Sequence, residues 1–338
     1  MPASLVSVVA NLTPGIQTRF ADTYARHYEG MRAKMGMVMD LAVPSQGAYE
    51  IYTAFNSAPY ARRWDRGNPR FSKGFTDFQF TVNNVDWNVG VEAHVNDVMD
   101  DRSQYLEKQA QDAGGSVGGL PERVFYQAIQ GATDPALLAA VPNAPDGAAM
   151  FSATTGAGGD RFGVSGGNLI TGSGVATSGA IISDFFNATE RFRQFQDTEG
   201  QPLFDGAIID KPLVLTYNVA NDKVVQEAFK QSRPVSIVQN VAGTENVAAA
   251  AVTNIIMESG YQVSLWPTQR ITTNDLFLFA TGSPVKPFFQ QTRQASAMRI
   301  QTPENSDEAR RNKIVGWYWD CREGYGVNTP YGAIKVDN

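Results

Sequence analysis

The sequence predicts an α+β fold, and three patterns carry this prediction. Apolar residues recur every three or four positions near the N-terminus, which is typical of one face of a helix. Aromatic and β-branched residues alternate with polar ones in two other stretches, which is typical of strands. Between these stretches, strand and helix patterns follow one another, which predicts an α/β layer around a central sheet.

Size and composition narrow the class of protein. The chain has 338 residues, of which 43% are hydrophobic and 18% charged. It can therefore bury a sizeable core, and its neutral polar surface is cheap to desolvate against neighbouring proteins. The formal net charge of −6 argues against a dedicated nucleic-acid binder, although local basic patches remain open. A lone cysteine and the lack of long apolar runs indicate a protein without a membrane span in the reducing cytoplasm.

Residues 1–45 are expected to form an N-terminal arm that carries a helix. Thr13 can serve as its N-cap and Pro14 as its first residue. An apolar stripe then lies on one face. It consists of Phe20, Tyr24, Tyr28, Met31 and Met35. Two alternatives stay open, because this face can pack on its own domain or on a neighbouring subunit.

Residues 46–91 are expected to form a long two-stranded hairpin with a cationic tip. The tip carries Arg62, Arg63, Arg66, Arg70 and Lys73 against the single carboxylate of Asp65. A hairpin of this kind is only marginally stable alone in water, so it needs cover from elsewhere. We expect the tip to contact an acidic protein surface, with nucleic acid as the alternative partner.

A helical region follows and begins with acidic residues, namely Asp97, Asp100 and Asp101. Adjacent aspartates on a helix point about 100° apart, so a solvated face is preferred to a catalytic acid pair. Glycines between residues 114 and 119 cost roughly 1 kcal/mol each inside a helix, which predicts a break or a kink. Farther on, the glycine-rich run at residues 154–179 has the composition of a flexible surface loop.

The last region returns to β structure. Strands are expected over residues 288–300 and 314–326. Trp317, Tyr318 and Trp319 are consecutive, so both faces of the second strand must hold bulky rings and be covered.

Residues that would carry chemistry are few. His27 and His94 stand outside every hydrolase or metal motif, and one cysteine with two histidines argues against a structural zinc site. Residues 158–163 have glycines at P-loop spacing but lack the lysine that should follow. We therefore expect no catalytic, cofactor-binding or metal-ligating residues, no cofactor, and no enzyme activity.

Short motifs support a family resemblance. They are Ala48-Tyr49-Glu50-Ile51-Tyr52, Asn96-Asp97-Val98-Met99-Asp100-Asp101, Asp146-Gly147-Ala148-Ala149-Met150-Phe151, Val285-Lys286-Pro287-Phe288-Phe289-Gln290, Gly316-Trp317-Tyr318-Trp319-Asp320 and Gly324-Tyr325-Gly326. In this order they resemble the Mu-like phage major head subunit family, with the Hong Kong 97-type capsid fold.

This resemblance implies a division of the chain. Residues 1–45 would be the N-arm, 46–91 the E-loop hairpin, 92–135 the spine helix with the first part of the peripheral domain, 136–281 the axial domain, and 282–338 the second part of the peripheral domain.

The resemblance also implies a function, that of a major capsid protein. Such a protein self-assembles as hexamers and pentamers into the icosahedral head of a tailed phage, in the host cytoplasm. The head encloses double-stranded DNA without sequence-specific binding or membrane, and portal, scaffold or decoration proteins would be further partners. The cationic tip (Arg62, Arg63, Arg66 and Arg70) would lie on the acidic surface of a neighbour (Asp97, Asp100 and Asp101). A surface-layer or other shell protein is the alternative, and a hydrolase a more remote one.

Overall fold

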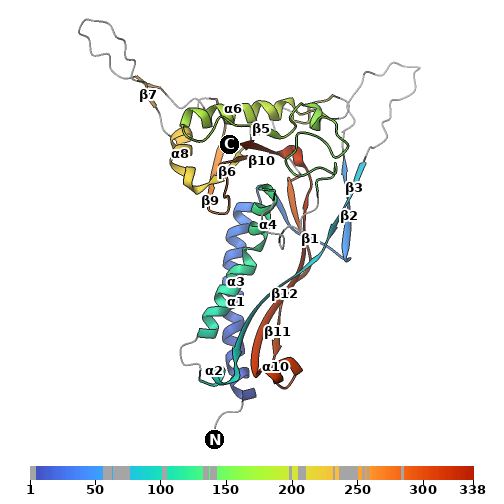
Figure 1. Cartoon of the computed structure of the whole chain (residues 1–338), viewed down its shortest axis with the longest axis vertical. Helices are drawn as coiled ribbons and strands as arrows, with labels where there is room; N and C mark the ends of the chain where they lie inside the picture. Colours follow the sequence, from blue (N-terminus) through green and yellow to red (C-terminus); the bar gives the residue numbers. More distant parts are fainter. Residues whose placement is uncertain are drawn as a thin grey trace, which may run out of the picture.

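The computed structural model describes residues 5–55, 63, 77–100, 105–131, 137, 143–197, 200–204, 211–230, 233–235, 250–252, 256, 259–282 and 285–338. Figure 1 shows a tall stem of long helices and strands, with a second layer lying across its upper end. The N-terminus lies at the lower end of the stem and the C-terminus in the upper layer. We call these two parts the stem and the transverse layer.

A four-stranded sheet forms one side of the stem. Its order is β1-β11-β12-β4, with β1 parallel to β11 and the other pairs antiparallel. The bounds are β1 Met39–Pro44, β4 Val85–His94, β11 Phe288–Gln301 and β12 Ile314–Val327. The two long strands expected near the C-terminus are therefore confirmed.

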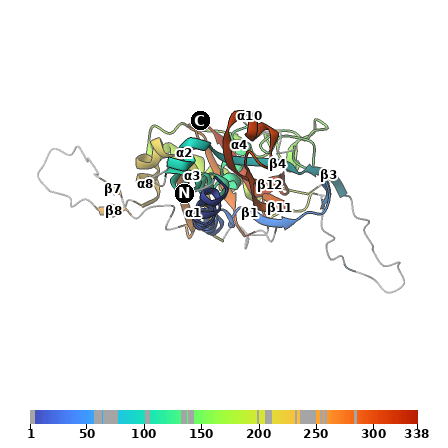
Figure 2. The ribbon, with the colours of Figure 1, turned by 90° about the horizontal axis from the view of Figure 1, so that it is seen from below.

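Helices cover one face of this sheet, and seen from below α1 and α3 lie beside its strands (Figure 2). The stem helices are α1 Leu5–Met35, α2 Val95–Asp100, α3 Tyr105–Gly118 and α4 Leu120–Ile129. Phe20 of α1 stacks on Trp319 of β12 with ring centroids 4.2 Å apart, and Trp317 is fully buried beside it. α1 therefore packs on its own chain, which is one of the two alternatives that the sequence left open.

The helix start expected at Thr13 and Pro14 is wrong, because α1 begins at Leu5 and continues through Pro14. Proline lacks the N–H that an interior helical residue donates. The hydroxyl of the preceding residue, Thr13, makes two hydrogen bonds at this point of the helix. Thr13 donates to the carbonyl of Val9 and accepts from the indole N–H of Trp317 at 3.2 Å.

The break expected at residues 114–119 is found only at the last of these residues: α3 runs through Gly114 and Gly118, and Gly119 separates it from α4. A Cβ at Gly114 would lie 2.5 Å from the carbonyl oxygen of Phe20, and one at Gly118 would lie 2.8 Å from that of Tyr24. Glycine spaced by four residues therefore lets α1 and α3 approach closely. The packing between the helices offsets the propensity cost that led to the prediction.

The transverse layer contains a five-stranded sheet of order β5-β13-β10-β6-β9, covered by α6 and α8. The bounds are β5 Leu169–Thr171, α6 Ser178–Gln194, β6 Leu213–Asn218, α8 Asp222–Lys230, β9 Val263–Thr268, β10 Leu276–Ala280 and β13 Ala333–Asp337. The expected α/β layer around a central sheet is therefore confirmed. Strand β13, at the end of the chain, joins this sheet between β5 and β10.

The glycine-rich run is not simply a flexible surface loop. It contains the 3₁₀ turn η1 Arg161–Gly163 and the edge strand β5, and it leads into α6 at Ser178. Arg161 and Asn168 within it are fully buried. Composition predicted a loop here because the partners that bury these polar residues lie elsewhere in the chain.

Two small hairpins lie on opposite sides of the molecule, one beside the upper stem and the other at the transverse layer (Figures 1 and 2). One pairs β2 Tyr49–Phe55 with β3 Asp77–Asn83, and the other pairs β7 Arg233–Val235 with β8 Ala250–Val252. The expected hairpin over residues 46–91 is thus too long, because β4 joins the stem sheet. Three short helices complete the described structure: η2 Val219–Asn221, α10 Asp307–Asn312 and η3 Pro330–Gly332.

Within the part of the chain that the structure describes, no helix is long and apolar enough to cross a membrane.

Candidate assembly surfaces

The β2–β3 hairpin has one covered and one uncovered face. Tyr52 and Phe80 pair across the strands and pack on Phe289 of β11, with ring centroids 4.6 Å (Tyr52) and 6.3 Å (Phe80) from that of Phe289. The opposite face carries Tyr49 and Ile51, which are 54% and 59% exposed. A two-stranded sheet with exposed apolar side chains is a candidate contact surface.

A polar network fixes the base of this hairpin to the stem. The Asn84 amide donates to Ser45 at 2.7 Å, and the Gln291 amide donates to Asn84 at 2.9 Å. The Tyr52 hydroxyl donates to Gln291 at 2.8 Å. Glu50 accepts from the backbone N–H groups of Gln46 and Gly47 and from the Ser45 hydroxyl, and these hydrogen bonds lower the pKa of its carboxyl. The hairpin therefore leaves the stem at a set angle.

Two glycines of β12 let the hairpin approach the stem sheet. A Cβ at Gly324 would lie 2.6 Å from the carbonyl oxygen of Asn83, and one at Gly326 would meet the ring of Phe289 and lie 3.0 Å from Val82. This geometry gives a physical role to the Gly324-Tyr325-Gly326 motif.

The other face of the stem sheet is polar, and Tyr318 lies flat on it. A Cβ at either Gly90 or Gly316 would meet the Tyr318 ring. Its hydroxyl donates to Glu92, and this contact, after burial of the hydroxyl, helps to raise the pKa of Tyr318 to about 12. Bulky rings on both faces of β12 are thus confirmed, but Tyr318 is only partly buried.

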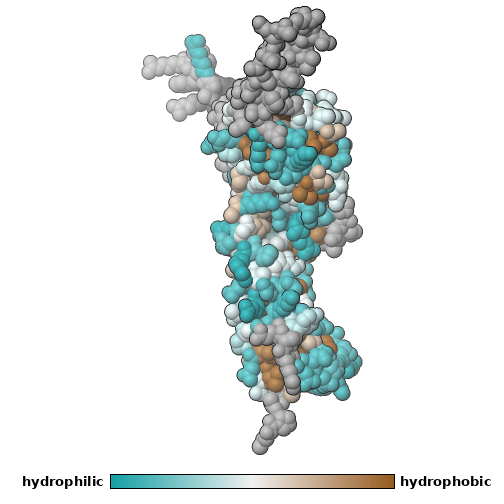
Figure 3. All heavy atoms as spheres, turned by 90° about the vertical axis from the view of Figure 1, so that its left-hand side faces the viewer, coloured by the Kyte–Doolittle hydropathy of each residue, from teal (hydrophilic) through white to brown (hydrophobic). Residues whose placement is uncertain are grey.

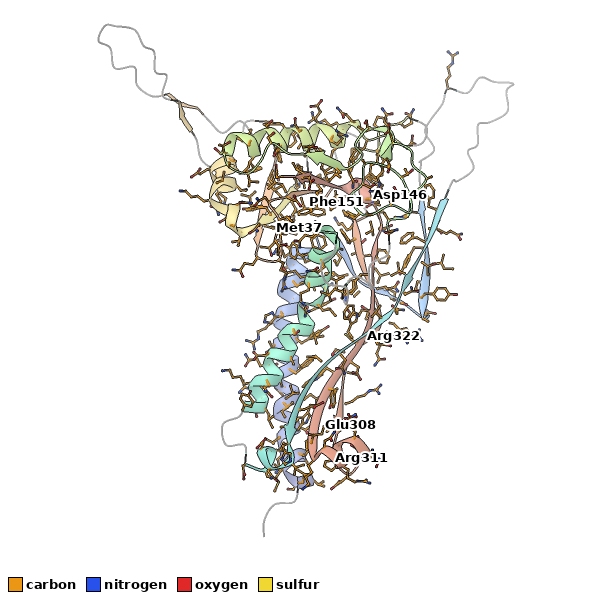
Figure 4. The ribbon with its side chains drawn as sticks, in the orientation of Figure 1. Met37, Asp146, Phe151, Glu308, Arg311 and Arg322 are labelled. Atoms are coloured by element: carbon orange, nitrogen blue, oxygen red, sulfur yellow. The ribbon has the colours of Figure 1, made fainter. Side chains whose placement is uncertain are left out.

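A buried ion pair holds the glycine-rich run in place. The Arg161 side chain is fully buried and donates to both oxygens of Asp146, at 2.7 and 2.9 Å. It also donates to the carbonyls of Ala149 and Met150 and to Asn168, whose amide reaches the carbonyl of Ala333 in β13. Figure 4 shows Asp146 in the transverse layer. Sequence reasoning missed this cluster, and only the Asp-Gly motif at its start gave a signal.

A second cluster missed from the sequence surrounds Glu323 in β12. Its carboxylate accepts from Gln290 and Tyr325, each at 2.8 Å, and is almost fully buried. Burial raises the pKa of this carboxyl despite the two hydrogen bonds. Burial, followed by the Glu323 charge, also raises the pKa of Cys321 to about 12, so this thiol is a poor nucleophile.

The sequence-predicted contact residues are only partly described. Arg62, Arg66, Arg70 and Asp101 lie outside the described residues, and Arg63 is exposed. Asp97 and Asp100 are exposed on the short helix α2, not on the long spine helix as expected. Helix α2 lies at the lower end of the stem, whereas β2 and β3 lie near its upper end (Figure 1). One chain therefore does not bring hairpin and acidic helix together, and the predicted contact between subunits remains a prediction.

An apolar groove of about 380 Å³ opens at the same lower end. It lies between the first turns of α1 and the end of β11, and it is lined by Leu5, Val6, Val9, Ala10, Thr13, Pro14, Ile300, Thr302, Glu304 and Asn305. Arg311 of α10 lies nearby, at the lower end of the stem (Figure 4). The side of the molecule in Figure 3 is mostly hydrophilic, with small separate apolar patches. Among the described residues, no group of three or more acidic, histidine or cysteine side chains could hold a metal ion.

Comparison with known families points in one direction. The profile of the family described as Mu-like prophage major head subunit gpT matches residues 9–139. This range runs from α1 through the hairpin to the end of the stem helices. No curated protein sequence matches the chain.

Solved structures share the whole architecture at low sequence identity. A virus-like particle from Pyrococcus furiosus has a TM-score of 0.53 at 10% identity and covers 95% of this chain and 98% of its own. The capsid of an empty GTA particle gives 0.54 at 10% identity, with 90% and 89% covered. The mature capsid of bacteriophage PhiM1 gives 0.52 at 10% identity, with 88% and 85% covered. These likenesses show the Hong Kong 97-type fold, and residues 9–139 are similar to the Mu-like prophage major head subunit.

Proposed function

We propose that copies of this chain assemble, as pentamers and hexamers, into the closed icosahedral head that encloses the DNA of a tailed phage. The chain acts as a structural protein and not as an enzyme. It assembles in the host cytoplasm and remains in the capsid of the virion. The observation that carries this proposal is the β2–β3 hairpin, whose inner face is anchored on β11 while its outer face exposes Tyr49 and Ile51.

A neighbouring copy would supply the missing cover. Burying apolar surface contributes about 25 cal/mol per Å². Burial of two large exposed side chains on one hairpin face would therefore favour the contact, and the gain would be repeated at every position of a shell. The rigid base of the hairpin supports this reading, because an arm held at a set angle loses little entropy when a partner binds.

Charge would set the register of the same contact. In this proposal Arg62, Arg63, Arg66 and Arg70 face Asp97, Asp100 and Asp101 of an adjacent copy. Asp97 and Asp100 are exposed, and no ion partner of theirs is found among the described residues. Exposed pairs contribute only about 0–1 kcal/mol each, so they would select the correct neighbour more than they strengthen the shell.

Electron microscopy of the expressed protein tests the proposal. We expect closed particles of uniform diameter. Flat or tubular sheets would favour the surface-layer alternative, and a monomer at high concentration would refute self-assembly. Reversal of Arg62, Arg63 and Arg66 to Glu should block particle formation while the subunit keeps its circular dichroism spectrum. The matched control replaces the same three residues with Lys, which keeps the charge and should still assemble.

A further inference from the structure

A cavity of about 690 Å³ lies where the stem meets the transverse layer. It is formed by helix α4 and by the segment that includes the end of β9. The described residues around it are Arg123, Tyr126, Gln127, Leu137, Pro267, Thr268, Gln269 and Arg270. Six of these eight side chains carry polar groups, and the two guanidinium groups are the only charged ones among them.

The electrostatic balance around the cavity is positive. Glu122 is shared between Lys34 at 3.3 Å and Arg270 at 3.7 Å. Arg123 donates to the hydroxyl of Ser116 at 3.3 Å and contacts no carboxylate among the described residues. Among the described residues, three cationic groups (Lys34, Arg123 and Arg270) thus stand against one carboxylate (Glu122), in a chain whose formal net charge is −6. This local excess of positive charge attracts anions.

The wall of the cavity is already organised. The Gln130 side chain bridges α4 to the segment after β9, since its amide donates to the carbonyl of Arg270 at 2.8 Å and its oxygen accepts from the N–H of Thr272 at 2.9 Å. The Thr268 hydroxyl accepts from the N–H of Arg270 at 3.1 Å, which leaves its hydrogen available to a ligand. A ligand would therefore meet donors that are held in place before it binds.

We infer that this cavity binds phosphate groups of nucleic acid without reading the base sequence. Planar guanidinium groups pair well with phosphate oxygens, and hydroxyl and amide donors complete such a site. The volume is far larger than one phosphate ion needs, which favours a strand over a free anion. The inference rests on the proposed function, because the DNA enclosed by the proposed head would supply the phosphates.

The expected affinity of one site is modest. Two arginines neutralise about two phosphates, which gives a slope of log affinity against log salt of roughly −2 for duplex DNA. The site would thus be weak at physiological salt, and its effect would come from repetition over the shell. Such contacts are compatible with an acidic chain, because only this local surface meets the phosphates.

Fluorescence anisotropy of labelled duplex DNA with the full-length, unassembled chain tests the inference at several salt concentrations. Arg123→Gln and Arg270→Gln should each weaken binding by about threefold to tenfold and lower the salt slope by about one. Arg299→Gln is the matched control, since it also removes one positive charge, from an exposed site on β11 far down the stem. It should change affinity less than twofold. If Arg270→Gln loses its folded spectrum, Arg123→Gln alone decides.

Three outcomes would overturn the inference: equal losses in the control and in Arg123→Gln, no loss in either cavity variant, or displacement of the DNA by polyglutamate as effectively as by unlabelled DNA. The last result would assign the cavity to an acidic polypeptide. Electron microscopy of the same preparations separates this test from that of the proposed function. Normal particles without cavity-dependent binding would refute only the phosphate site, whereas binding without particles would refute only self-assembly.

Discussion

Replacing Arg161 with Met is expected to destabilise the subunit by about 3–5 kcal/mol. The change keeps an unbranched side chain of similar length in a fully buried position, so it leaves only a small cavity. It removes five hydrogen bonds, two of them to Asp146. Breaking a buried ion pair by removing one partner costs about this amount, because the other charge is left without compensation.

The structure supports that magnitude from its separate contributions. The acceptors on Ala149, Met150 and Asn168 lose a donor at roughly 1 kcal/mol each. The Asp146 carboxylate keeps only the N–H of Ala148 at 3.3 Å among its described donors, and 14% of its side chain is exposed. Water can therefore relieve part of the penalty, which places the total nearer 3 than 5 kcal/mol for this pair.

Urea denaturation of the unassembled subunit, followed by circular dichroism, measures this loss. Two variants serve as matched comparisons. Asp146→Asn keeps the shape of the side chain and leaves the Arg161 guanidinium without its carboxylate, and the double variant removes both charges. We expect the double variant to lose clearly less stability than the two single losses added together. Additive losses, or an Arg161→Met loss below about 1 kcal/mol, would refute the reasoning that this pair holds the glycine-rich run on the sheet.

Three further changes test other parts of the structure. Glu323→Gln should make the subunit more stable at neutral pH and flatten the pH dependence of its stability. Burial raises the pKa of the Glu323 carboxyl in the folded state above the usual 4.5, so the wild type loses stability as pH rises through that raised pKa. Urea denaturation at several pH values from 4 to 8 measures the free energy of unfolding of both proteins. Gly118→Val should lower the free energy of unfolding by about 1–3 kcal/mol, because its side chain would push α1 away from α3. The control Gly30→Ala, at a position where a Cβ meets nothing, should raise the free energy of unfolding by up to about 1 kcal/mol. Equal melting temperatures of the two variants would contradict this. Gly326→Val should leave the subunit folded but displace the hairpin and abolish particles in electron microscopy, and normal particles would show that the hairpin angle does not matter.

The sequence predicted those features that depend on local pattern. Strands β11 and β12 follow from alternation of aromatic and β-branched residues. The basic hairpin was found as an element, but its end was placed too late, because alternation continues across Asn84. In the structure the buried Asn84 side chain bonds to Ser45 and Gly47, and the chain passes there from one sheet to another.

Features that depend on distant partners were not predictable in the same way. Gly114 and Gly118 weaken a helix when considered alone, and only the close approach of Phe20 and Tyr24 explains why α3 tolerates them. Arg161 lies in a run whose composition is that of a loop, and its burial is possible only because Asp146 and Asn168 satisfy it. The same limit applies to the cavity at α4, which joins residues more than a hundred positions apart.

The distribution of polar networks separates what one subunit completes from what it leaves to its neighbours. The stem and the transverse layer each bury their own aromatic core, and the clusters around Arg161 and Glu323 satisfy buried charge within one chain. The network at Asn84 differs, because it ties the base of a hairpin whose outer face stays exposed. An arm that only had to avoid unfolding would not need such an anchor. A fixed base directs the exposed face of the arm toward one position in space, which is what a contact repeated between identical subunits requires.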